Sequence, residues 1–423
     1  MASPDAVHWT LDPTVAFLNH GSFGAAPRVV QEAQRAWRDR MEREPVRFLD
    51  RELDRHLAYV RERLGAFIGA RPEDLAFVSN ATTGVNTVLQ SLRWEPGDEL
   101  LSTDHEYNAT LNALRHVAAR DGARVVIARI PFPIRSADQI VDAIVGAVTP
   151  RTRLALVSHI TSTTALVMPV ERIVRELAAR GVDTLLDAAH APGQVPLDLD
   201  ALGAAYTTGN AHKWLCAPKG AAFLHVRADR RDAIRPLVVS HGANERRTDR
   251  TRFRAEFDWT GTADPSAVLA IPTALDFLAG LRPGGWPELM ASNRALALAA
   301  RGHVGAALGI DLPAPDAMIG AMAALPLPGE VPPDVKTRLY DDDRIEVPVS
   351  TWPVDAALED GEAPRARLLR ISAQAYNDEI EYMRLAAALR ALRSGVWTAR
   401  SRQDAAPPDG PTLPQRGRSA SAE

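Results

Sequence analysis

The sequence predicts an α/β fold built on a mostly parallel sheet with helices on both faces. Between residues 75 and 226, short apolar runs alternate with stretches of helical periodicity, which is typical of parallel strands joined by crossover helices. The 423 residues allow two or three domains of ~150 residues, and 46% of them are hydrophobic, so a large core can form. We expect seven strands in this region, at Leu75–Ser79, Glu99–Thr103, Arg124–Ala128, Leu154–Ser158, Thr184–Asp187, Ala205–Thr208 and Ala221–Val226.

Helices are expected before and between these strands. Two precede the first strand, at about 27–43 and 49–68, and Pro27 suits the start of the first helix. Those between the strands span 83–92, 107–120, 136–147 and 169–180. We expect residues 1–24 to form an extended N-terminal arm and residues 25–280 to form a large domain.

The remaining sequence predicts a second, smaller domain. Residues 240–262 lack apolar periodicity and carry five arginines, so we expect a long charged loop there. Helices and strand-like runs then follow, at 266–281, 286–308, Ala317–Leu325, Arg344–Val349, Arg367–Ser372 and 377–394. We expect a small α+β domain over 281–400, completed by the N-terminal arm. Residues 401–423 contain four prolines and no aromatic residue, which predicts a disordered tail.

Composition excludes several classes of protein. The formal net charge of −4 argues against a nucleic-acid or membrane partner. The single cysteine, Cys216, excludes an internal disulfide and fits a reducing compartment. The sequence shows no N-terminal signal pattern and no apolar run of the ~18 residues needed to span a bilayer. We therefore expect a cytoplasmic protein.

One lysine and one aspartate indicate the chemistry. Only three of the 49 Lys and Arg residues are lysine, and two of these, Lys219 and Lys336, lie in a turn and after two prolines. Lys213 instead follows a predicted strand and is flanked by His and Trp. Asp187 ends an apolar strand 26 residues upstream, where an unpaired buried carboxylate would be costly. This pair predicts a pyridoxal phosphate (PLP) site, with Lys213 holding the aldehyde as a Schiff base and Asp187 keeping the pyridine nitrogen protonated.

Several polar segments can hold the phosphate of such a cofactor. The sequence from Asn80 to Gly84 follows a strand and opens a helix, where free N–H groups and the hydroxyls of Thr82 and Thr83 can bind an anion. A plain helix cap explains the same residues. Further candidates are Asn210, His212 and Thr262, although any turn can resemble the segment around Thr262.

Other candidates concern the ring and the substrate. His105 or Tyr107 can stack on a flat ring, and a capped helix start is the alternative. Hydroxyls at Thr161 and Ser162 can donate to a ring oxygen, or can simply form a Ser/Thr turn. His190 can contact the ring oxygen, although a single histidine is commonly structural. Arg370 lies in a strand of the small domain and can bind a substrate carboxylate bidentately, with a surface ion pair as the alternative.

The order of these motifs resembles a known family. The motifs are Asn19–Gly24, Asp104–Tyr107, Asp187–His190, Gly209–Trp214 and Phe257–Thr262. Together, from about Phe17 to Arg390, they resemble the class V aminotransferases among fold-type I PLP enzymes. Within that family they resemble the isopenicillin N epimerase-like branch, which is similar to the C–S lyases that act on cysteine conjugates. The resemblance implies a large domain with a mostly parallel seven-stranded sheet and a smaller α+β C-terminal domain.

The resemblance also implies roles for individual residues. Lys213 would be the Schiff-base lysine and Asp187 the partner of the pyridine nitrogen. The phosphate would be held by Thr82, Thr83, Asn210 and His212. Thr262 would reach the phosphate of a neighbouring subunit, which implies a homodimer with shared active sites. The amino-acid substrate would be bound by Asn19, His20, Gly21 and Arg370.

One departure from the family narrows the reaction. Cysteine desulfurases of this family use a cysteine on a mobile loop of the small domain, whereas residues 281–400 contain none. Cys216 lies only three residues after Lys213, so we do not expect it to take up sulfur. We expect C–S cleavage of an S-substituted cysteine, with epimerisation, transamination and decarboxylation-coupled deamination as alternatives. A non-enzymatic sensor of this fold is not expected, because Lys213 and Asp187 are both present and only about 17 residues precede the match.

Overall fold

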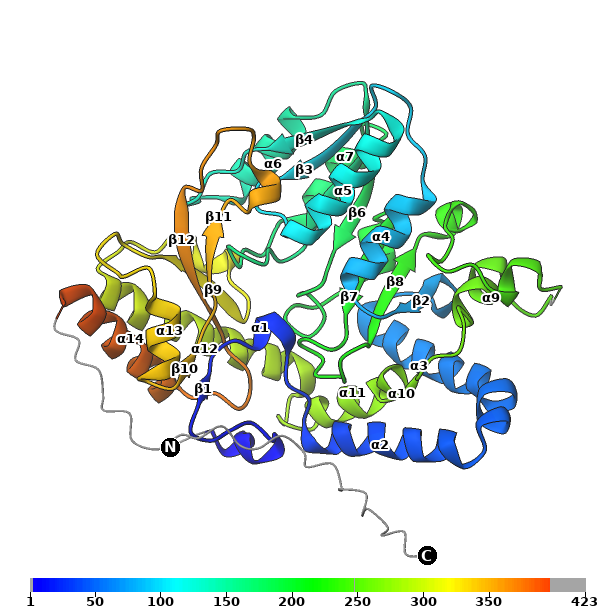
Figure 1. Cartoon of the computed structure of the whole chain (residues 1–423), viewed down its shortest axis with the longest axis horizontal. Helices are drawn as coiled ribbons and strands as arrows, with labels where there is room; N and C mark the ends of the chain where they lie inside the picture. Colours follow the sequence, from blue (N-terminus) through cyan, green and yellow to red (C-terminus); the bar gives the residue numbers. More distant parts are fainter. Residues whose placement is uncertain (1–2, 247, 396–423) are drawn as a thin grey trace, which may run out of the picture.

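A seven-stranded sheet forms the centre of the larger part of the chain (Figure 1). The computed structural model describes residues 3–246 and 248–395. In spatial order the strands are β2 (Leu75–Val78), β8 (Ala222–Val226), β7 (Tyr206–Asn210), β6 (Asp183–Asp187), β5 (Thr152–Ser158), β3 (Glu99–Thr103) and β4 (Arg124–Ala128). All neighbouring pairs are parallel except the two that involve β8. The prediction of a mostly parallel seven-stranded sheet is confirmed.

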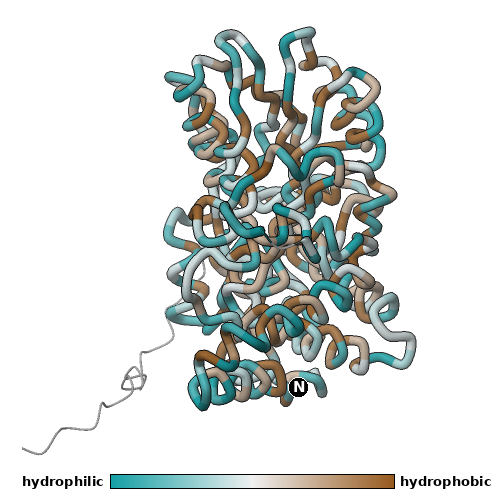
Figure 2. Tube along the Cα trace, turned by 90° about the vertical axis from the view of Figure 1, so that its right-hand side faces the viewer, coloured by the Kyte–Doolittle hydropathy of each residue, from teal (hydrophilic) through white to brown (hydrophobic). Residues whose placement is uncertain are grey.

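The helices between the strands also agree with the prediction, to within two residues at each end. They are α4 (Ala81–Ser91), α5 (Asn108–Asp121), α6 (Ala137–Gly146) and α7 (Val170–Ala178), and a short α8 (Leu199–Leu202) was not expected. Helix α7 shows why such segments fold: its buried residues recur at helical spacing, at Val170, Ile173, Val174 and Leu177. Hydrophobic and hydrophilic residues accordingly alternate along the helical parts of the chain (Figure 2).

The charged segment 240–262 is not wholly a loop, and that expectation was wrong. It contains α9 (Arg252–Asp258), whose N-cap Thr251 accepts a hydrogen bond from the amide of Arg254. Phe253 and Phe257 lie one turn apart and are buried in the core next to the sheet. Their i,i+4 spacing is typical of a helix, but the many arginines in this segment favoured the interpretation as a charged loop.

Before the sheet, α2 (Arg28–Arg43) and α3 (Leu53–Ile68) form as expected, with a π-helical turn at Arg47–Glu52 between them. After α9, the expected helix 266–281 is divided into α10 (Ser266–Leu269) and α11 (Ile271–Ala279), because Pro272 occupies the first turn of the second helix. The long helix α12 (Gly285–Leu308) then leads into the smaller part of the chain.

A three-stranded antiparallel sheet organises this smaller part. Its order is β11 (Val349–Trp352), β12 (Ala366–Ser372) and β9 (Met322–Pro326), and the helices α13 (Val335–Asp341) and α14 (Glu379–Ser394) accompany it. The expected strand Ala317–Leu325 begins with a 3-10 turn and becomes β9. The expected strand Arg344–Val349 is two strands, β10 (Ile345–Glu346) and β11, separated by Pro348, which has no N–H to donate to a ladder.

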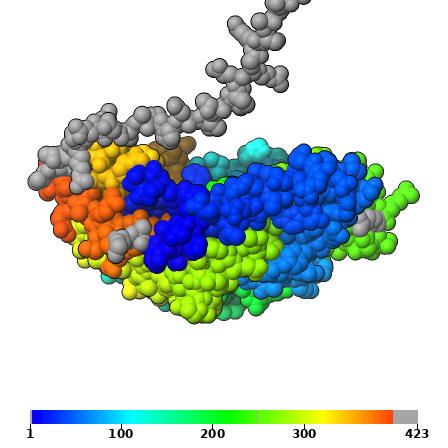
Figure 3. All heavy atoms as spheres, turned by 90° about the horizontal axis from the view of Figure 1, so that it is seen from below, coloured from blue at the N-terminus to red at the C-terminus, as the bar shows by residue number. Residues whose placement is uncertain are grey.

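The N-terminal residues pack against the C-terminal ones. Strand β1 (Ala16–Phe17) pairs in parallel with β10, and the hydroxyl of Ser3 donates to the carbonyl of Ala375 at 2.6 Å. Figure 3 shows the dark blue N-terminal residues lying against the orange C-terminal ones.

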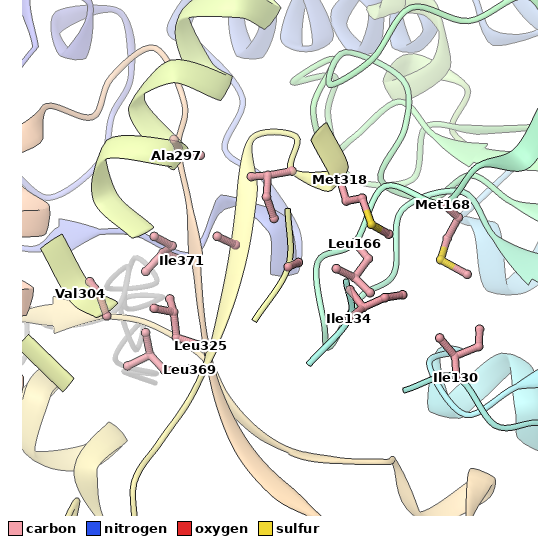
Figure 4. Close-up of a cluster of buried hydrophobic side chains, with 14 of the residues drawn as sticks. Ile130, Ile134, Leu166, Met168, Ala297, Val304, Met318, Leu325, Leu369 and Ile371 are labelled. Carbon is pink, nitrogen blue, oxygen red and sulfur yellow. The ribbon is translucent and has the colours of Figure 1, made fainter. Parts of the chain in front are cut away.

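One hydrophobic cluster joins the two parts. It includes Ile130 and Leu166 from the larger part and Ala297, Leu325 and Leu369 from the smaller part (Figure 4). The parts of the chain before and after residue 280 therefore share a hydrophobic core. The described helices include none that is both long and apolar enough to cross a membrane. The segment expected to form a tail, 401–423, lies outside the described residues.

Candidate active site

A cavity of about 830 Å³ opens where the carboxyl ends of the central strands meet the smaller part of the chain. Strand ends contribute Ser158 (β5), Asp187 (β6) and Asn210 (β7) to its wall. The N-terminus of α4 and residues 348–355 close other sides. Ligands on open α/β sheets bind at this edge, and the volume falls in the range of small-molecule sites.

Lys213 presents its amine to this cavity. Its Nζ lies 3.1 Å from Nε2 of His190. Desolvation, together with the charge of Arg370, lowers the pKa of Lys213 to about 7. With such a pKa about half of the lysine is a neutral, nucleophilic amine at pH 7, which is the form that attack on a carbonyl requires.

His190 is held in one tautomer. Burial lowers its pKa well below the ordinary value, so its ring is neutral. The indole Nε1–H of Trp214, which can only donate, points to His190 Nδ1 at 3.4 Å. Nδ1 is therefore the acceptor and Nε2 carries the proton, which it donates to the Lys213 amine.

Asp187 is the expected partner of a ring nitrogen. It is 4% exposed, and its Oδ1 accepts a hydrogen bond from the amide of Ala189 at 2.9 Å. Burial raises its pKa, which means that this site favours a cation beside the carboxylate. The protonated pyridine nitrogen of PLP would supply that cation, so the residues fit this cofactor.

The N-terminus of α4 forms the opposite end of the site. The amide of Ala81 donates to Asn210 Oδ1 at 2.8 Å, and Thr82 and His212 also line the cavity. Gly84 allows α4 to approach β7, because a Cβ there would collide with the side chain of Thr208. A phosphate at this end would meet the positive end of the helix dipole and Thr82, whereas the amides of Ala81 and Thr83 already donate to side-chain oxygens.

Thr83 does not line this cavity, which corrects its expected role. Its amide and hydroxyl donate to Asn80 Oδ1 at 2.8 and 3.1 Å, so it serves the helix cap. The plain-cap alternative describes this residue correctly.

His105 and Tyr107, the two candidates for stacking on a cofactor ring, lie in different places relative to the cavity. Tyr107 lines the cavity and is 44% exposed. His105 is fully buried, with its ring edge-on to Phe132 and Trp352 and its Nε2 3.2 Å from the carbonyl of Ile130. Of the two candidates, the structure therefore places Tyr107, and not His105, in the cavity wall.

The two candidate hydroxyls after β5, those of Thr161 and Ser162, also differ in whether they reach the cavity. Ser162 lines the cavity. Thr161 is buried, where its Oγ1 accepts from the amide of Leu166 at 2.8 Å and lies 2.8 Å from Thr164 Oγ1. Thr161 therefore stabilises the turn, and its expected contact with the ring is not supported.

Arg370 is free to bind an anion. It is 7% exposed, and its Nη atoms donate to neutral oxygens only: the carbonyl of Ser162 at 2.7 Å, Ser22 Oγ at 2.9 Å and Asn19 Oδ1 at 3.4 Å. No acidic side chain among the described residues pairs with it, and its Nε is buried without a partner. The surface ion-pair alternative thus fails, and a substrate carboxylate fits.

Of the three N-terminal candidates, only Gly21 lines the cavity. Asn19 lies behind it and orients Arg370. His20 is fully buried; Tyr376 Oη donates to its Nδ1 at 2.8 Å, and its Nε2 donates to the carbonyl of Lys213 at 3.0 Å. His20 therefore supports the Lys213 backbone, which corrects its expected contact with substrate.

Thr262 is exposed in the segment after α9 and does not line this cavity. Its expected contact is with a neighbouring subunit, and this stays a prediction.

Three residues near the cavity were not predicted. Ser22 bonds Arg370, Ser158 ends β5 beside Asp187, and Glu106 accepts the Ser158 hydroxyl hydrogen bond. Glu106 belongs to the Asp104–Tyr107 motif and directly precedes Tyr107. Its acidic side chain, just after a predicted strand end, was the signal that could have identified it.

Comparison with known proteins places the chain among relatives. The family model of aminotransferase class-V matches residues 17–381. Isopenicillin N epimerase from Amycolatopsis lactamdurans is 40% identical over 90% of this chain and 96% of its own length. The probable chloroplastic L-cysteine desulfhydrase of Arabidopsis thaliana is 32% identical, over 90% and 83%. The solved structure of the cystine C–S lyase C-DES with cysteine persulfide shares the fold, with a TM-score of 0.74, 22% identity and coverage of 90% and 98%.

Proposed function

The chain belongs to the class V aminotransferase family of pyridoxal phosphate enzymes, and from this premise we propose that it cleaves the C–S bond of an S-substituted cysteine by β-elimination. The observation that carries the proposal is the pairing of a neutral Lys213 amine with an unpaired Arg370 guanidinium in one cavity. An amino acid with a free α-carboxylate fits between them, and a single base is sufficient for elimination.

The cofactor would be held at three points. Lys213 would bind its aldehyde, Asp187 would pair with its ring nitrogen, and the start of α4 with Asn210 would receive its phosphate. Tyr107 would cover the ring face. When bound, the cofactor supplies an electron sink for the electron pair left at Cα.

The protein's own groups then account for the steps. Arg370 fixes the carboxylate and so orients Cα. The freed Lys213 amine removes the Cα proton, and the thiolate leaves from Cβ. With one water molecule, the substrate gives a thiol, ammonia and pyruvate.

Epimerisation is the second candidate. The 40% and 37% identical relatives named isopenicillin N epimerase favour it. This reaction needs a second proton donor on the face of Cα opposite Lys213, and Tyr107 is the cavity residue that could serve. Transamination would instead require a keto acid to accept the amino group.

A homodimer with shared sites is part of the proposal. Exposed apolar residues in one segment support it: Leu237, Val238 and Val239 are 48%, 58% and 74% exposed. Leu237 and Val238 line a neighbouring pocket together with Thr260 and Gly261, so a second copy covering this pocket would also meet Thr262.

Product analysis tests the reaction. S-Alkyl cysteines are incubated with the enzyme, with and without a keto acid, and Lys213→Ala serves as control. Elimination predicts equal amounts of thiol, ammonia and pyruvate without keto acid. Recovery of inverted amino acid with Cα deuterium from heavy water, and no thiol, would instead establish epimerisation.

A further inference from the structure

Glu106 is a buried carboxyl without a cationic partner. It lies between β3 and α5, is 1% exposed, and forms no ion pair among the described residues. Its Oε1 accepts hydrogen bonds from the Ser158 hydroxyl and, at 2.9 Å, from the amide of Tyr107. Its Oε2 is buried with no hydrogen-bond partner. An ionised carboxylate in this position would be costly, because no donor satisfies Oε2, and this favours the neutral acid.

Ser158 links this carboxyl to Asp187. Ser158 and Asp187 are register partners at the ends of β5 and β6, and both line the cavity. Burial, followed by the charge of Asp187, raises the pKa of Glu106, and burial also raises the pKa of Asp187. Two carboxyls in such a place do not both ionise, because each disfavours the charge of the other.

The surroundings leave Asp187 as the group to be ionised. The amide of Ala189 donates to Asp187 and lowers the pKa of Asp187, and the protonated nitrogen of the cofactor ring would add a cation there, whereas no cation acts on Glu106. Other titratable groups on neighbouring residues include His159, directly after β5, and Asp104 and His105 on the same turn as Glu106. Asp104 is already paired with Arg365 at 3.0 Å, and burial lowers the pKa of both histidines to about 4, so they add no charge near neutrality.

We propose that Glu106 is a positioning residue: as a neutral acid it holds the Ser158 hydroxyl beside Asp187 and leaves Asp187 as the single negative charge for the cofactor ring. It also accepts a hydrogen bond from the amide of Tyr107 and so fixes the backbone of that residue. One side chain thus positions groups at the ring nitrogen (Ser158 beside Asp187) and over the ring face (Tyr107). This inference rests on the proposed cofactor site but not on the choice of reaction.

Glu106→Gln is the decisive variant, because glutamine keeps the shape and the acceptor of a neutral acid at every pH. Its infrared difference spectrum against the cofactor-free wild type should show loss of a protonated carboxyl. Glu99→Gln is the matched control: Glu99 is also buried, but Arg124 and Arg151 bond it and its pKa is lowered, so an ionised carboxylate should be lost there. Loss of an ionised carboxylate in Glu106→Gln would overturn the proposal.

Cofactor binding provides the second measurement, followed by absorption and fluorescence of bound PLP. At pH 7, Glu106→Gln should bind PLP within about two-fold of wild type, while Glu106→Ala should bind at least ~10-fold more weakly. As the pH rises above neutrality, the wild-type spectrum should respond to ionisation of Glu106, and the Gln variant should lack that response. Equal weakening by Gln and Ala, or an unchanged response in the Gln variant, would overturn the proposal.

A double-mutant cycle tests the path through Ser158. If Glu106 acts through this hydroxyl, the effects of Ser158→Ala and Glu106→Ala on PLP affinity should be strongly non-additive. Fully additive effects would contradict the assigned role. None of these three measurements needs turnover, so a failure of the C–S lyase assignment leaves these outcomes unchanged.

Discussion

The side-chain amine of Lys213 accepts a hydrogen bond from Nε2 of His190 across 3.1 Å. The direction of this bond follows from Trp214, which occupies Nδ1 of the same ring. Because a neutral imidazole donor stabilises only the neutral amine, His190 helps to keep Lys213 unprotonated. The site is thus prepared for covalent capture of an aldehyde before any cofactor arrives.

Replacing His190 should make Lys213 harder to deprotonate. In the cofactor-free protein, the rate of PLP capture should rise with pH through about 7, where the lowered pKa of Lys213 lies. His190→Phe removes a hydrogen bond worth ~1 kcal/mol, so this midpoint should move upward by about 0.7 pH. Stopped-flow absorbance across pH measures it, and a midpoint that stays or falls would contradict the assigned direction.

The buried Lys213 should destabilise the cofactor-free protein in a pH-dependent manner. Its folded-state pKa of about 7 lies below the ordinary lysine value of 10.5, so the unfolded chain binds the additional proton between these values. Stability therefore falls as the pH decreases from about 10.5 to 7 and is not lowered further below 7. Lys213→Met should be more stable than wild type in urea, and its advantage should shrink as pH rises through this window. The exposed Lys336→Met is the control and should show no such trend.

Ser22 should influence substrate affinity through Arg370. Its Oγ accepts from Nη2 at 2.9 Å, a bond to a charged group of the kind that contributes about 1.5–3 kcal/mol. Ser22→Ala should raise KM about 10-fold or more with kcat nearly unchanged. Steady-state kinetics with Ser350→Ala, a cavity residue that does not bond Arg370, provide the comparison. A fall in kcat with unchanged KM would remove Ser22 from this role.

Asp187→Ala should keep the fold and lose at least ~100-fold in turnover, which corresponds to ~2.7 kcal/mol of barrier. The physical reason is that an unprotonated ring withdraws electrons poorly. Asp183→Ala, at the other end of β6, removes a carboxylate that pairs with Arg230 on the surface and should leave turnover unchanged. Near-normal turnover of Asp187→Ala would show that another group fills its place.

Cys216 should not take part in the reaction. Burial raises the pKa of its thiol to about 12, so almost no thiolate forms near neutrality. Cys216→Ala should retain activity within a few-fold. Mass spectrometry after turnover should find no persulfide on the wild-type protein. A persulfide at Cys216 would instead indicate a cysteine desulfurase activity.

The features that the sequence reveals are those determined locally. Asp187 and Lys213 could be placed from the sequence because Asp187 ends one strand and Lys213 closely follows the next, and these strand ends lie at one edge of the sheet. Whether His105, Glu106 or Tyr107 faces the cavity depends on the geometry of a single turn, which residue type does not specify. Helix α9 depends on burial of Phe253 and Phe257 against distant strands.

Other features depend on contacts across most of the chain. Strand β1 has only two residues, and its partner β10 lies more than 300 positions later, so no local pattern indicates it. The burial of Arg370 and its pairing with Ser22 and Asn19 arise from the same long-range packing. Such contacts decide between a substrate-binding arginine and a surface ion pair, which the sequence left open.

The docking of the N-terminal segment has a consequence for biosynthesis. His20 supports Lys213, while the amide of Gly21 donates to Ser372 Oγ at 3.1 Å and Ser22 reaches Arg370. The first residues to leave the ribosome thus wait for some of the last before they find their native partners. Lys213 is synthesised before the C-terminal residues that contact His20, Gly21 and Ser22, so these contacts form only after residue 376 has emerged. A cavity that contains Arg370 and its N-terminal partner Ser22 can therefore form only after strand β12 has been synthesised.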